Sequence, residues 1–131
     1  MAVDTTKDRL ERIRNLTEDL LLKQRWAWFL RAKYTSSGPA LMPWQEAELS
    51  ALEDEIQEGG EELGALRREA LGMIRELHDS VMEYILVARY LDGMTWREIS
   101  ERSGYSRTWV TKLHARGIEA PDAMKEEKPG V

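Results

Sequence analysis

The chain has 131 residues, of which 42% are hydrophobic and 33% are charged, and its formal net charge at pH 7 is −5. This length suits one small domain, or a small domain with an extended helical arm, and no segment approaches the roughly 18 apolar residues that a membrane span requires. The polar N-terminus argues against a signal peptide, and the absence of cysteine excludes disulfides and thiol chemistry. We therefore expect a cytoplasmic protein with no membrane partner.

The charge is unevenly distributed along the chain. Residues 7–33 carry eight Lys or Arg against four acids, a net +4, and residues 46–83 carry twelve acids against three arginines, a net −9. Residues 84–117 carry six Arg or Lys against three acids, a net +3. The overall negative charge argues against a protein that coats nucleic acid, whereas the positive third segment suits a module oriented on DNA.

The first predicted helix begins near Thr5 or Thr6 and runs until the segment 36–39, Ser-Ser-Gly-Pro, breaks it. An apolar stripe at three- and four-residue spacing supports it: Leu10, Ile13, Leu16, Leu20 and Leu21. Its end is crowded with aromatics, namely Trp26, Trp28, Phe29 and Tyr34. Stacking on single-stranded bases is one reading of these rings, but clustered tryptophans more often make core or partner contacts, which we favour.

A second predicted helix starts after Pro43, and its apolar residues repeat in heptads: Leu49, Leu52, Ile56, Leu63, Leu66, Ala70, Met73 and Leu77. The repeat keeps its phase through Gly59 and Gly60, which favours one long helix, with a hairpin at these glycines as the alternative. The stripe then continues to Leu91, so His78 and Asp79 are interpreted as a polar helix surface. Asp92 and Gly93 end the helix.

Residues 95–118 have the spacing of a helix-turn-helix. Thr95 and Glu98 fit a capping box, Gly104 lies where a short turn needs positive φ, and Ser106 offers a second N-cap. The second helix is predicted to run to about Arg116. Four residues are expected to close the core between the two helices: Ile99, Val110 and Leu113, with Tyr105 beside them.

The opposite face of this second helix carries cations and hydroxyls and no acid. It holds Arg107, Thr108, Thr111, Lys112 and Ala115, with Trp109 and Arg116 at its margins. Such a face suits the major groove of DNA, whereas the plainer reading is a solvated helix. We favour DNA recognition because both caps, the turn glycine and the core spacing agree.

Residues 77–118 resemble the fourth region of bacterial sigma-70-type factors. The residues that carry the resemblance are Arg89, Tyr90, Gly93, Thr95, Glu98, Ile99, Gly104, Ser106, Arg107, Val110 and Leu113. The chain is more similar still to short phage and prophage transcription regulators of the ArpU and RinA type, which join this module to a helical N-terminal half. Their Tyr-Ser turn and Leu-His pair correspond to Tyr105, Ser106, Leu113 and His114.

The resemblance implies that five residues face bases and phosphates: Arg107, Thr108, Trp109, Thr111 and Lys112. Trp109 departs from the sigma pattern, where a charged or polar residue is usual. The chain also lacks room for the sigma regions that grip the polymerase core and melt the promoter, so it is not a complete sigma factor.

Other chemistry finds little support in the sequence. His78 and His114 have no partner at metal-ligand spacing, and His114, which is expected near the end of the recognition helix, is interpreted as a donor to a helix carbonyl, with a phosphate contact as the alternative. The acids between residues 53 and 62 lack the pattern of a calcium loop. No nucleophile with a base and no phosphate-binding glycine loop is visible, so we expect no enzyme, metal or cofactor.

The sequence thus predicts an all-α protein whose long, coiled-coil-like N-terminal helices precede a sigma-region-four-like helix-turn-helix. The expected domains are a helical oligomerisation or partner-binding region at 1–75, a DNA-binding domain at 76–118 and a disordered tail at 119–131. The predicted function is sequence-specific binding of double-stranded DNA in transcription regulation. The expected DNA-binding residues are Arg97, Ser106, Arg107, Thr108, Trp109, Thr111, Lys112 and Arg116. Of these, Arg97 and Ser106 are expected to contact the DNA backbone.

Two alternatives remain at this stage. One is a small terminase-like DNA-packaging subunit, and the other is a sigma-like adaptor that docks on RNA polymerase without reading DNA. The stripe on the second helix needs cover, which the 5–34 helix could supply within one chain. A homodimer is nevertheless expected, because two such helices with extra Trp, Phe and Leu leave more apolar surface than one antiparallel pair hides. The residues of that stripe are Leu49, Leu52, Ile56, Leu63, Leu66 and Met73.

Overall fold

The computed structural model of the chain describes residues 5–36, 38 and 40–127, with side chains described as far as residue 120. Its elements are α1 (Thr6–Tyr34), α2 (Pro43–Arg75), α3 (Ser80–Leu86), the π-helical turn η1 (Val87–Leu91), α4 (Trp96–Ser103) and α5 (Arg107–Glu127). The described ranges contain no β-strand, so the predicted all-α class is confirmed.

The chain divides into two compact units. Residues 15–65 form one, the hairpin unit, and the residues before 15 together with those after 65 form the other, the head unit. The head unit therefore takes in the first turns of α1 and the last turns of α2, which the expected boundary at residue 76 assigned to the N-terminal region. Each unit has its own core and is described separately.

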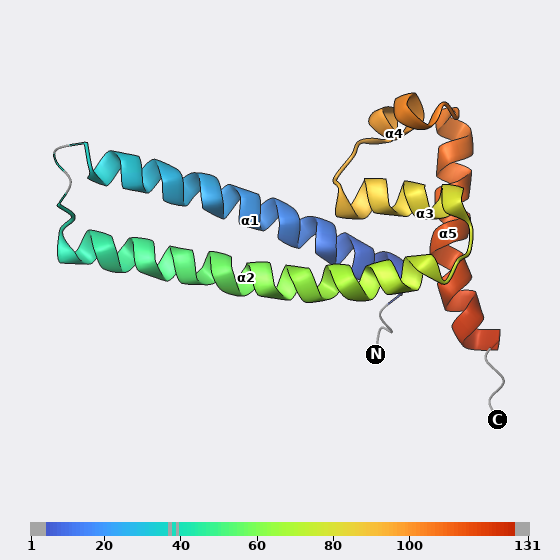
Figure 1. Cartoon of the computed structure of the whole chain (residues 1–131), viewed down its shortest axis with the longest axis horizontal. Helices are drawn as coiled ribbons and strands as arrows, with labels where there is room; N and C mark the ends of the chain where they lie inside the picture. The colour runs from blue at the N-terminus through green and yellow to red at the C-terminus, as the bar shows by residue number, and fades with distance from the viewer. Residues whose placement is uncertain (1–4, 37, 39, 128–131) are drawn as a thin grey trace. The chain divides into compact units, whose positions relative to one another are not determined.

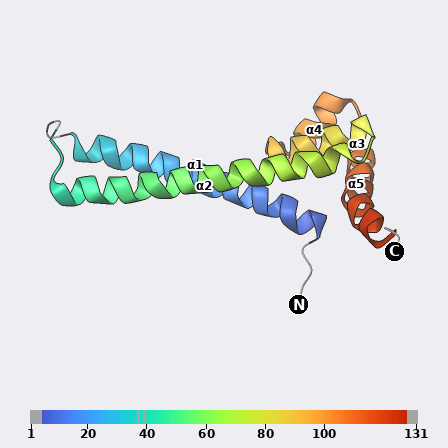
Figure 2. The same ribbon diagram turned by 60° about the horizontal axis from the view of Figure 1, so that its bottom comes forward.

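In the hairpin unit, α1 and α2 run side by side and antiparallel (Figures 1 and 2). Leu30, Leu49 and Leu52 are buried between them, and four partly buried residues pack against this cluster: Ala27, Tyr34, Leu41 and Ile56. Leu49 and Leu52, which the sequence placed on a self-association stripe, are thus covered by α1 of the same chain. Of the two covers that the sequence left open for this stripe, the helix of the same chain is the one found at Leu49 and Leu52.

Ion pairs and hydrogen bonds across the hairpin unit join a basic α1 to an acidic α2. The Tyr34 hydroxyl donates to Glu48 Oε2 at 2.7 Å, and this bond raises the pKa of Tyr34 above its usual value. Lys23 Nζ lies 3.7 Å from Glu55 Oε2, and Arg31 pairs with Glu53. These groups are exposed, so each contributes little stability, but together they favour one register of the two helices.

Gly59 and Gly60 lie inside α2, and the chain reverses instead between α1 and α2. The favoured reading of the sequence is confirmed and the hairpin alternative is wrong. A Cβ placed on Gly59 would lie 2.5 Å from Leu20 Cδ2, whereas a Cβ on Gly60 would meet nothing within 4 Å. Gly59 therefore permits α1 and α2 to approach closely, which accounts for a glycine in a helix interior.

In the head unit, the predicted continuous stripe from α2 to residue 91 is interrupted. α2 ends at Arg75, and His78 adopts a φ of 52°. Asp79 Oδ1 then accepts from the amides of Val81 and Met82, both at 3.0 Å, and caps α3. The interpretation of His78 and Asp79 as a polar helix surface is therefore wrong, because Asp79 offers the chain a new helix start.

The core of the head unit is formed by buried residues from α3, η1, α4 and α5. They are Ile85, Ala88, Ile99, Val110 and Leu113, and Val81, Met82, Met94 and Trp96 pack against them. The predicted core positions Ile99, Val110 and Leu113 are confirmed. Tyr105 is not part of this cluster, because its side chain is 40% exposed at the turn before α5.

The π-helical turn η1 was not foreseen from the sequence. The Asp92 amide donates to the Val87 carbonyl oxygen at 2.9 Å, and Gly93 follows with a φ of 69°. The predicted end of the helix at Asp92 and Gly93 is therefore confirmed. The wider turn leaves Ala88, Tyr90 and Leu91 all buried against the rest of the head unit.

The last helix is longer than predicted. The sequence placed its end near Arg116 and a disordered tail at 119–131, but α5 runs to Glu127, and residues 128–131 lie outside the described ranges. A Cβ on Gly117 would lie 3.2 Å from Leu86 Cδ1, and Ile118 is buried. Gly117 thus lies close to Leu86 and continues the helix rather than ending it.

Candidate nucleic-acid interface

The start of α4 and the start of α5 are each fixed by a cap. The Glu98 amide donates to Thr95 Oγ1 at 3.2 Å and the Thr95 amide donates to Glu98 Oε1 at 3.3 Å, which completes the predicted capping box. Gly104 has a φ of 79°. Ser106 Oγ accepts from the Trp109 amide at 3.1 Å, as a second N-cap. The predicted caps and turn are therefore confirmed, and they fix where α5 begins.

Two serines of α4 also hold the turn between α4 and α5 in place. Ser100 Oγ donates to the Tyr105 carbonyl oxygen at 2.6 Å, and Ser103 Oγ accepts from the Tyr105 amide at 3.2 Å. Both polar groups of the Tyr105 backbone are thus satisfied within the turn. The turn is accordingly held at both ends and in its middle, so α5 is presented in a defined orientation on α4.

The inward face of α5 is apolar and the outward face is polar. Val110 and Leu113 are buried with exposed fractions of 0% and 7%. All seven residues of the predicted reading face are exposed: Arg107, Thr108, Trp109, Thr111, Lys112, Ala115 and Arg116. No Asp or Glu occurs between residues 107 and 118. The outward face therefore presents three cations and two hydroxyls that are free of local acidic partners on the same helix segment.

Two hydroxyls near the start of α5 take part in local hydrogen bonds. Thr111 Oγ1 donates to the Thr108 carbonyl oxygen at 2.9 Å, so its hydrogen is used inside the helix. Ser106 Oγ is an acceptor in the cap, and its own hydrogen can still be donated outward. Ser106 is thus suited to an acceptor such as a phosphate oxygen at the helix N-terminus.

Trp109 and Arg116 form a pair that the sequence did not indicate. The Arg116 guanidinium carbon lies 5.9 Å from the centroid of the Trp109 ring, and Trp109 is 41% exposed. A cation at this distance from an indole is weakly attracted to it. The pair places a flat aromatic surface and a positive charge together at the edge of the reading face.

Arg97 on α4 is already paired, which the sequence reading missed. Its Nε lies 3.1 Å from Glu101 Oε1, and both side chains are well exposed. The i,i+4 spacing of these two residues was the available signal. Arg97 can meet a phosphate only by sharing or exchanging this partner, so its expected anchoring role is weaker than that of Arg107.

Behind the reading face lies a polar aromatic cluster around His114. A hydrogen bond of 2.6 Å joins His114 Nε2 and the Tyr90 hydroxyl, and the Trp96 ring meets the His114 ring edge-on at 4.7 Å. Arg89 lies over Trp96, 4.4 Å from its centroid, and donates to the Met94 carbonyl oxygen at 3.2 Å. The cluster therefore ties η1 and α4 to α5.

This cluster corrects the expected role of His114. The sequence interpretation made it a donor to a helix carbonyl, with a phosphate contact as the alternative, but its ring is half-buried against Tyr90 and Trp96. Burial, together with the nearby cations Arg89 and Lys7, lowers the pKa of His114 from 6.5 to about 4. His114 is therefore a neutral packing residue.

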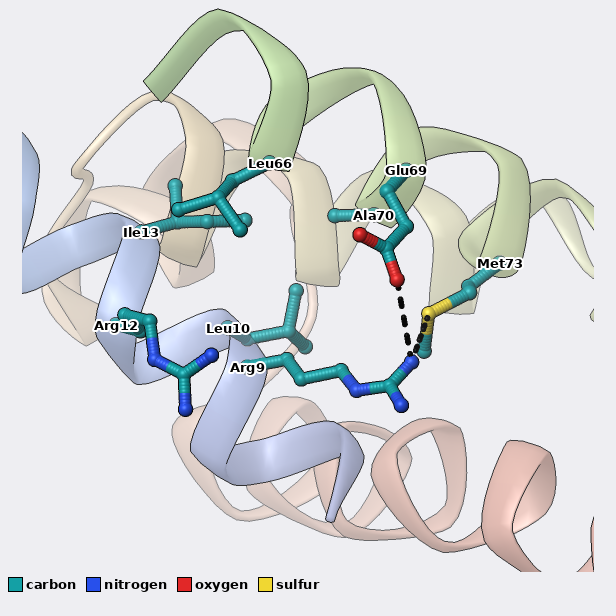
Figure 3. Close-up of a pocket in the computed structure, with 8 residues that line it drawn as sticks. All are labelled: Arg9, Leu10, Arg12, Ile13, Leu66, Glu69, Ala70 and Met73. Atoms are coloured by element: carbon teal, nitrogen blue, oxygen red, sulfur yellow. Dashed lines mark hydrogen bonds and ion pairs between the residues drawn. The ribbon is translucent and has the colours of Figure 1, made fainter. Parts of the chain in front are cut away.

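A small pocket lies in the head unit between the first turns of α1 and the last turns of α2, with a volume of about 170 Å³. Figure 3 shows that the Arg9 side chain reaches across it to α2, where its Nη1 lies 3.4 Å from Glu69 Oε1 and 3.6 Å from Met73 Sδ. The other residues that line it are Leu10, Arg12, Ile13, Leu66 and Ala70. Most of its lining residues are apolar, and its one carboxylate, that of Glu69, is paired with Arg9.

No family model, no curated protein and no solved structure matches this chain. In the ranges that the structure describes, no group of three or more His, Cys, Asp or Glu is placed to hold a metal ion, and no helix has both the length and the apolar character to cross a membrane. Among the described residues, the exposed face of α4 and α5 is the candidate interface.

Proposed function

We propose that the chain is a sequence-specific duplex-DNA-binding regulator of transcription, of phage or prophage type. In this proposal α4 and α5 form a helix-turn-helix, and residues 107–116 of α5 enter the major groove. The observation that carries the proposal is an acid-free, exposed face on a helix whose start is capped by Ser106 and whose other face packs into a buried core. A groove-reading helix needs this combination of rigidity and positive polar surface.

The residues divide by the type of contact that their chemistry allows. Arg107 and Lys112 are the first choices for base edges or phosphates, because a cation can donate to guanine or to a phosphate oxygen. Thr108 and Thr111 would supply supporting hydrogen bonds. Ser106 and Arg97 would meet the DNA backbone. Trp109 and Arg116 lie at the margin, where an indole can pack against sugar or thymine methyl groups.

The proposal is tested by selecting bound duplexes from a random-sequence pool and titrating the enriched site with variants. We expect Arg107→Ala and Lys112→Ala to weaken specific binding by roughly 1–3 kcal/mol, or about 5- to 150-fold, if each makes a base contact. A matched control is Arg68→Ala, which removes an exposed arginine of the head unit that lies on α2 and outside the proposed helix-turn-helix. Circular dichroism checks that each variant keeps its helix content.

The salt dependence of binding separates the two kinds of contact. Removing a cation that contacts only a phosphate should lower the salt dependence of binding by about one unit. It should also weaken binding to all sequences alike. If no motif is enriched, or if both α5 variants bind like the Arg68→Ala control, the groove assignment fails.

One observation favours a second candidate, an adaptor that docks on RNA polymerase. The exposed Trp109 ring lies on the face that would otherwise carry only polar contacts, and partly exposed tryptophans are frequent at protein interfaces. In that case Trp109→Ala should abolish binding to polymerase, and duplex DNA should bind without sequence preference. The pool selection distinguishes the two candidates directly.

A further inference from the structure

The α1 segment of the hairpin unit has two apolar faces, of which α2 covers only one. Leu20 and Leu30 are buried against α2, with exposed fractions of 7% each. On other faces of the same helix, Leu21, Leu22, Trp28 and Phe29 are 49%, 63%, 75% and 57% exposed. A helix that is apolar on opposite sides is normally buried on both. The outer face of α1 therefore has the composition of a covered surface.

The spacing on this outer face is symmetric about Arg25. Leu21 and Leu22 lie four and three residues before Arg25, and Trp28 and Phe29 lie three and four residues after it. Residues three and four apart share one side of a helix, so all five belong to one patch. Here this patch, Leu21, Leu22, Arg25, Trp28 and Phe29, is called the outer face.

Symmetry of this kind makes the outer face complementary to itself. If two copies pack antiparallel around a two-fold axis at Arg25, Leu21 of one copy faces Phe29 of the other, and Leu22 faces Trp28. Each leucine pair then meets an aromatic pair, twice in one interface. A two-fold interface requires such matching of a patch with its own rotated copy.

The charges at the two ends of the outer face also match under this rotation. Glu18 lies seven residues before Arg25, and Lys33 lies eight residues after it. An antiparallel partner therefore brings its Lys33 toward Glu18. Arg25 faces its own copy at the axis, which is the one unfavourable element, although the neighbouring Trp28 ring of the partner offers it an aromatic surface.

The charge of the hairpin unit argues against nucleic acid as the occupant. Residues 15–34 carry four basic residues and two acids, a net +2, whereas residues 43–65 carry eight acids and no basic residue, a net −8. The unit as a whole is therefore at −6. It therefore offers no net positive charge that would attract a phosphate backbone or an anionic membrane surface.

The area of the outer face is large enough for a dimer. With about 150–250 Å² for each large side chain, the observed exposed fractions leave roughly 500 Å² on these four residues of each copy. Two copies would thus bury on the order of 1,000 Å² of surface, before the aliphatic parts of Glu18 and Arg25 and the methyl group of Ala32 are counted. This area reaches the lower limit of specific protein interfaces.

We propose that the outer face of α1 binds a second copy of this chain, with the two α1 helices antiparallel around Arg25. The proposal does not rest on DNA binding. It differs from the self-association stripe expected from the sequence, because Leu49 and Leu52 of that stripe are buried inside one chain. The dimer surface is instead on the opposite side of α1.

Single cysteines test the arrangement, since the chain contains no cysteine of its own. In Arg25→Cys the two thiols of a dimer lie at the axis, so mild oxidation should give a disulfide-linked dimer on a non-reducing gel. In Ala32→Cys, on the same side of the helix and also exposed, the two thiols are about 21 Å apart at 1.5 Å per residue and should stay reduced.

The same pair of variants also exposes a wrong register. A parallel pair of helices would cross-link at both positions. Cross-linking at both positions, at position 32 alone or at neither would therefore overturn the antiparallel arrangement.

Sedimentation equilibrium tests whether the outer face drives association at all. We expect the full chain to be a dimer at tens of micromolar, and Leu22→Glu and Phe29→Glu to raise its dissociation constant at least about tenfold. Met42→Glu is the matched control, because Met42 is as exposed as Phe29, at 57% each, but lies outside α1. A monomeric full chain overturns the proposal, and so does a dimer that the two outer-face variants leave intact. Circular dichroism confirms that the variants remain helical.

Discussion

At the scale of single residues, His114 is held neutral by its surroundings. Its lowered pKa, about 4, follows first from burial and then from Arg89 and Lys7. The unfolded chain, with a histidine pKa near 6.5, therefore takes up a proton before the folded chain does. The stability that the neutral ring contributes is fully present above pH 6.5 and is lost as the pH falls from 6.5 toward 4.

We therefore expect the free energy of unfolding to fall more steeply below pH 6.5 in the natural chain than in His114→Gln. The difference in slope should stay below the roughly 1.4 kcal/mol per pH unit of one full proton, because the ring is only half-buried. Urea titrations between pH 7 and pH 4.5 measure it. His78→Asn, which removes the only other histidine and suits a positive φ, should keep the natural slope. Equal slopes in His114→Gln and the natural chain would contradict this account.

The helix faces of the candidate-site residues could be predicted from the sequence, but contacts between residues more than four positions apart could not. Helical spacing separates Val110 and Leu113 from Arg107 and Lys112 by face, and the structure agrees. The approach of Arg116 to Trp109, and of His114 to Tyr90, depends on rotamers and on the crossing of two helices. Neither is fixed by one-dimensional periodicity.

At the scale of elements, the neighbouring residues Gly59 and Gly60 of α2 differ in the space that a side chain would have. Alanine at Gly60 meets nothing within 4 Å, so Gly60→Ala should raise the free energy of unfolding by up to about 1 kcal/mol through helix propensity. Alanine at Gly59 must displace the buried Leu20 side chain. Forcing that side chain off its rotamer costs on the order of 1 kcal/mol.

Gly59→Ala should therefore gain about 1 kcal/mol less than Gly60→Ala, or lose stability outright. Thermal or urea unfolding of the two variants beside the natural chain measures the difference. Equal gains would mean that α1 and α2 are not held together at Gly59.

The starts of α4 and α5 were predictable from the sequence, whereas the break between α2 and α3 and the π-helical turn η1 were not. The residue types and the spacing of Thr95, Glu98 and Ser106 alone predict two helix starts, and the structure contains both. The interruption before Asp79 and the π-turn at η1 are hidden, because the apolar stripe keeps its phase across both. There the chain follows tertiary packing of the head unit, which a single-sequence pattern does not contain.

At the scale of the whole molecule, self-association through α1 and DNA binding through α5 together predict the symmetry of the DNA site. A two-fold dimer through α1 would carry two copies of the α5 face. We expect the motif enriched from a random pool to be an inverted repeat. Phe29→Glu, which should yield monomers, is expected to bind one half-site with weaker affinity and unchanged sequence preference.

Footprinting on the enriched duplex, with the natural chain and with Phe29→Glu, measures the protected length. An enriched motif without two-fold symmetry, bound by a dimeric protein, would separate self-association from DNA reading. The two proposals would then stand or fall independently, since the cysteine variants report on the dimer alone.

The hydrogen bond from the Thr111 hydroxyl to the Thr108 carbonyl oxygen gives the α5 face a chemical polarity. A free hydroxyl can either donate or accept a hydrogen bond, so it can pair with any base edge. Here the helix backbone occupies the hydrogen, and the oxygen is left as an acceptor only. In the major groove the matching donors are the exocyclic amino groups of adenine and cytosine. On a bound duplex, Thr111 would therefore favour bases that present an amino group over bases that present a keto group. The hydrogen bond inside α5 sets this preference in the free protein.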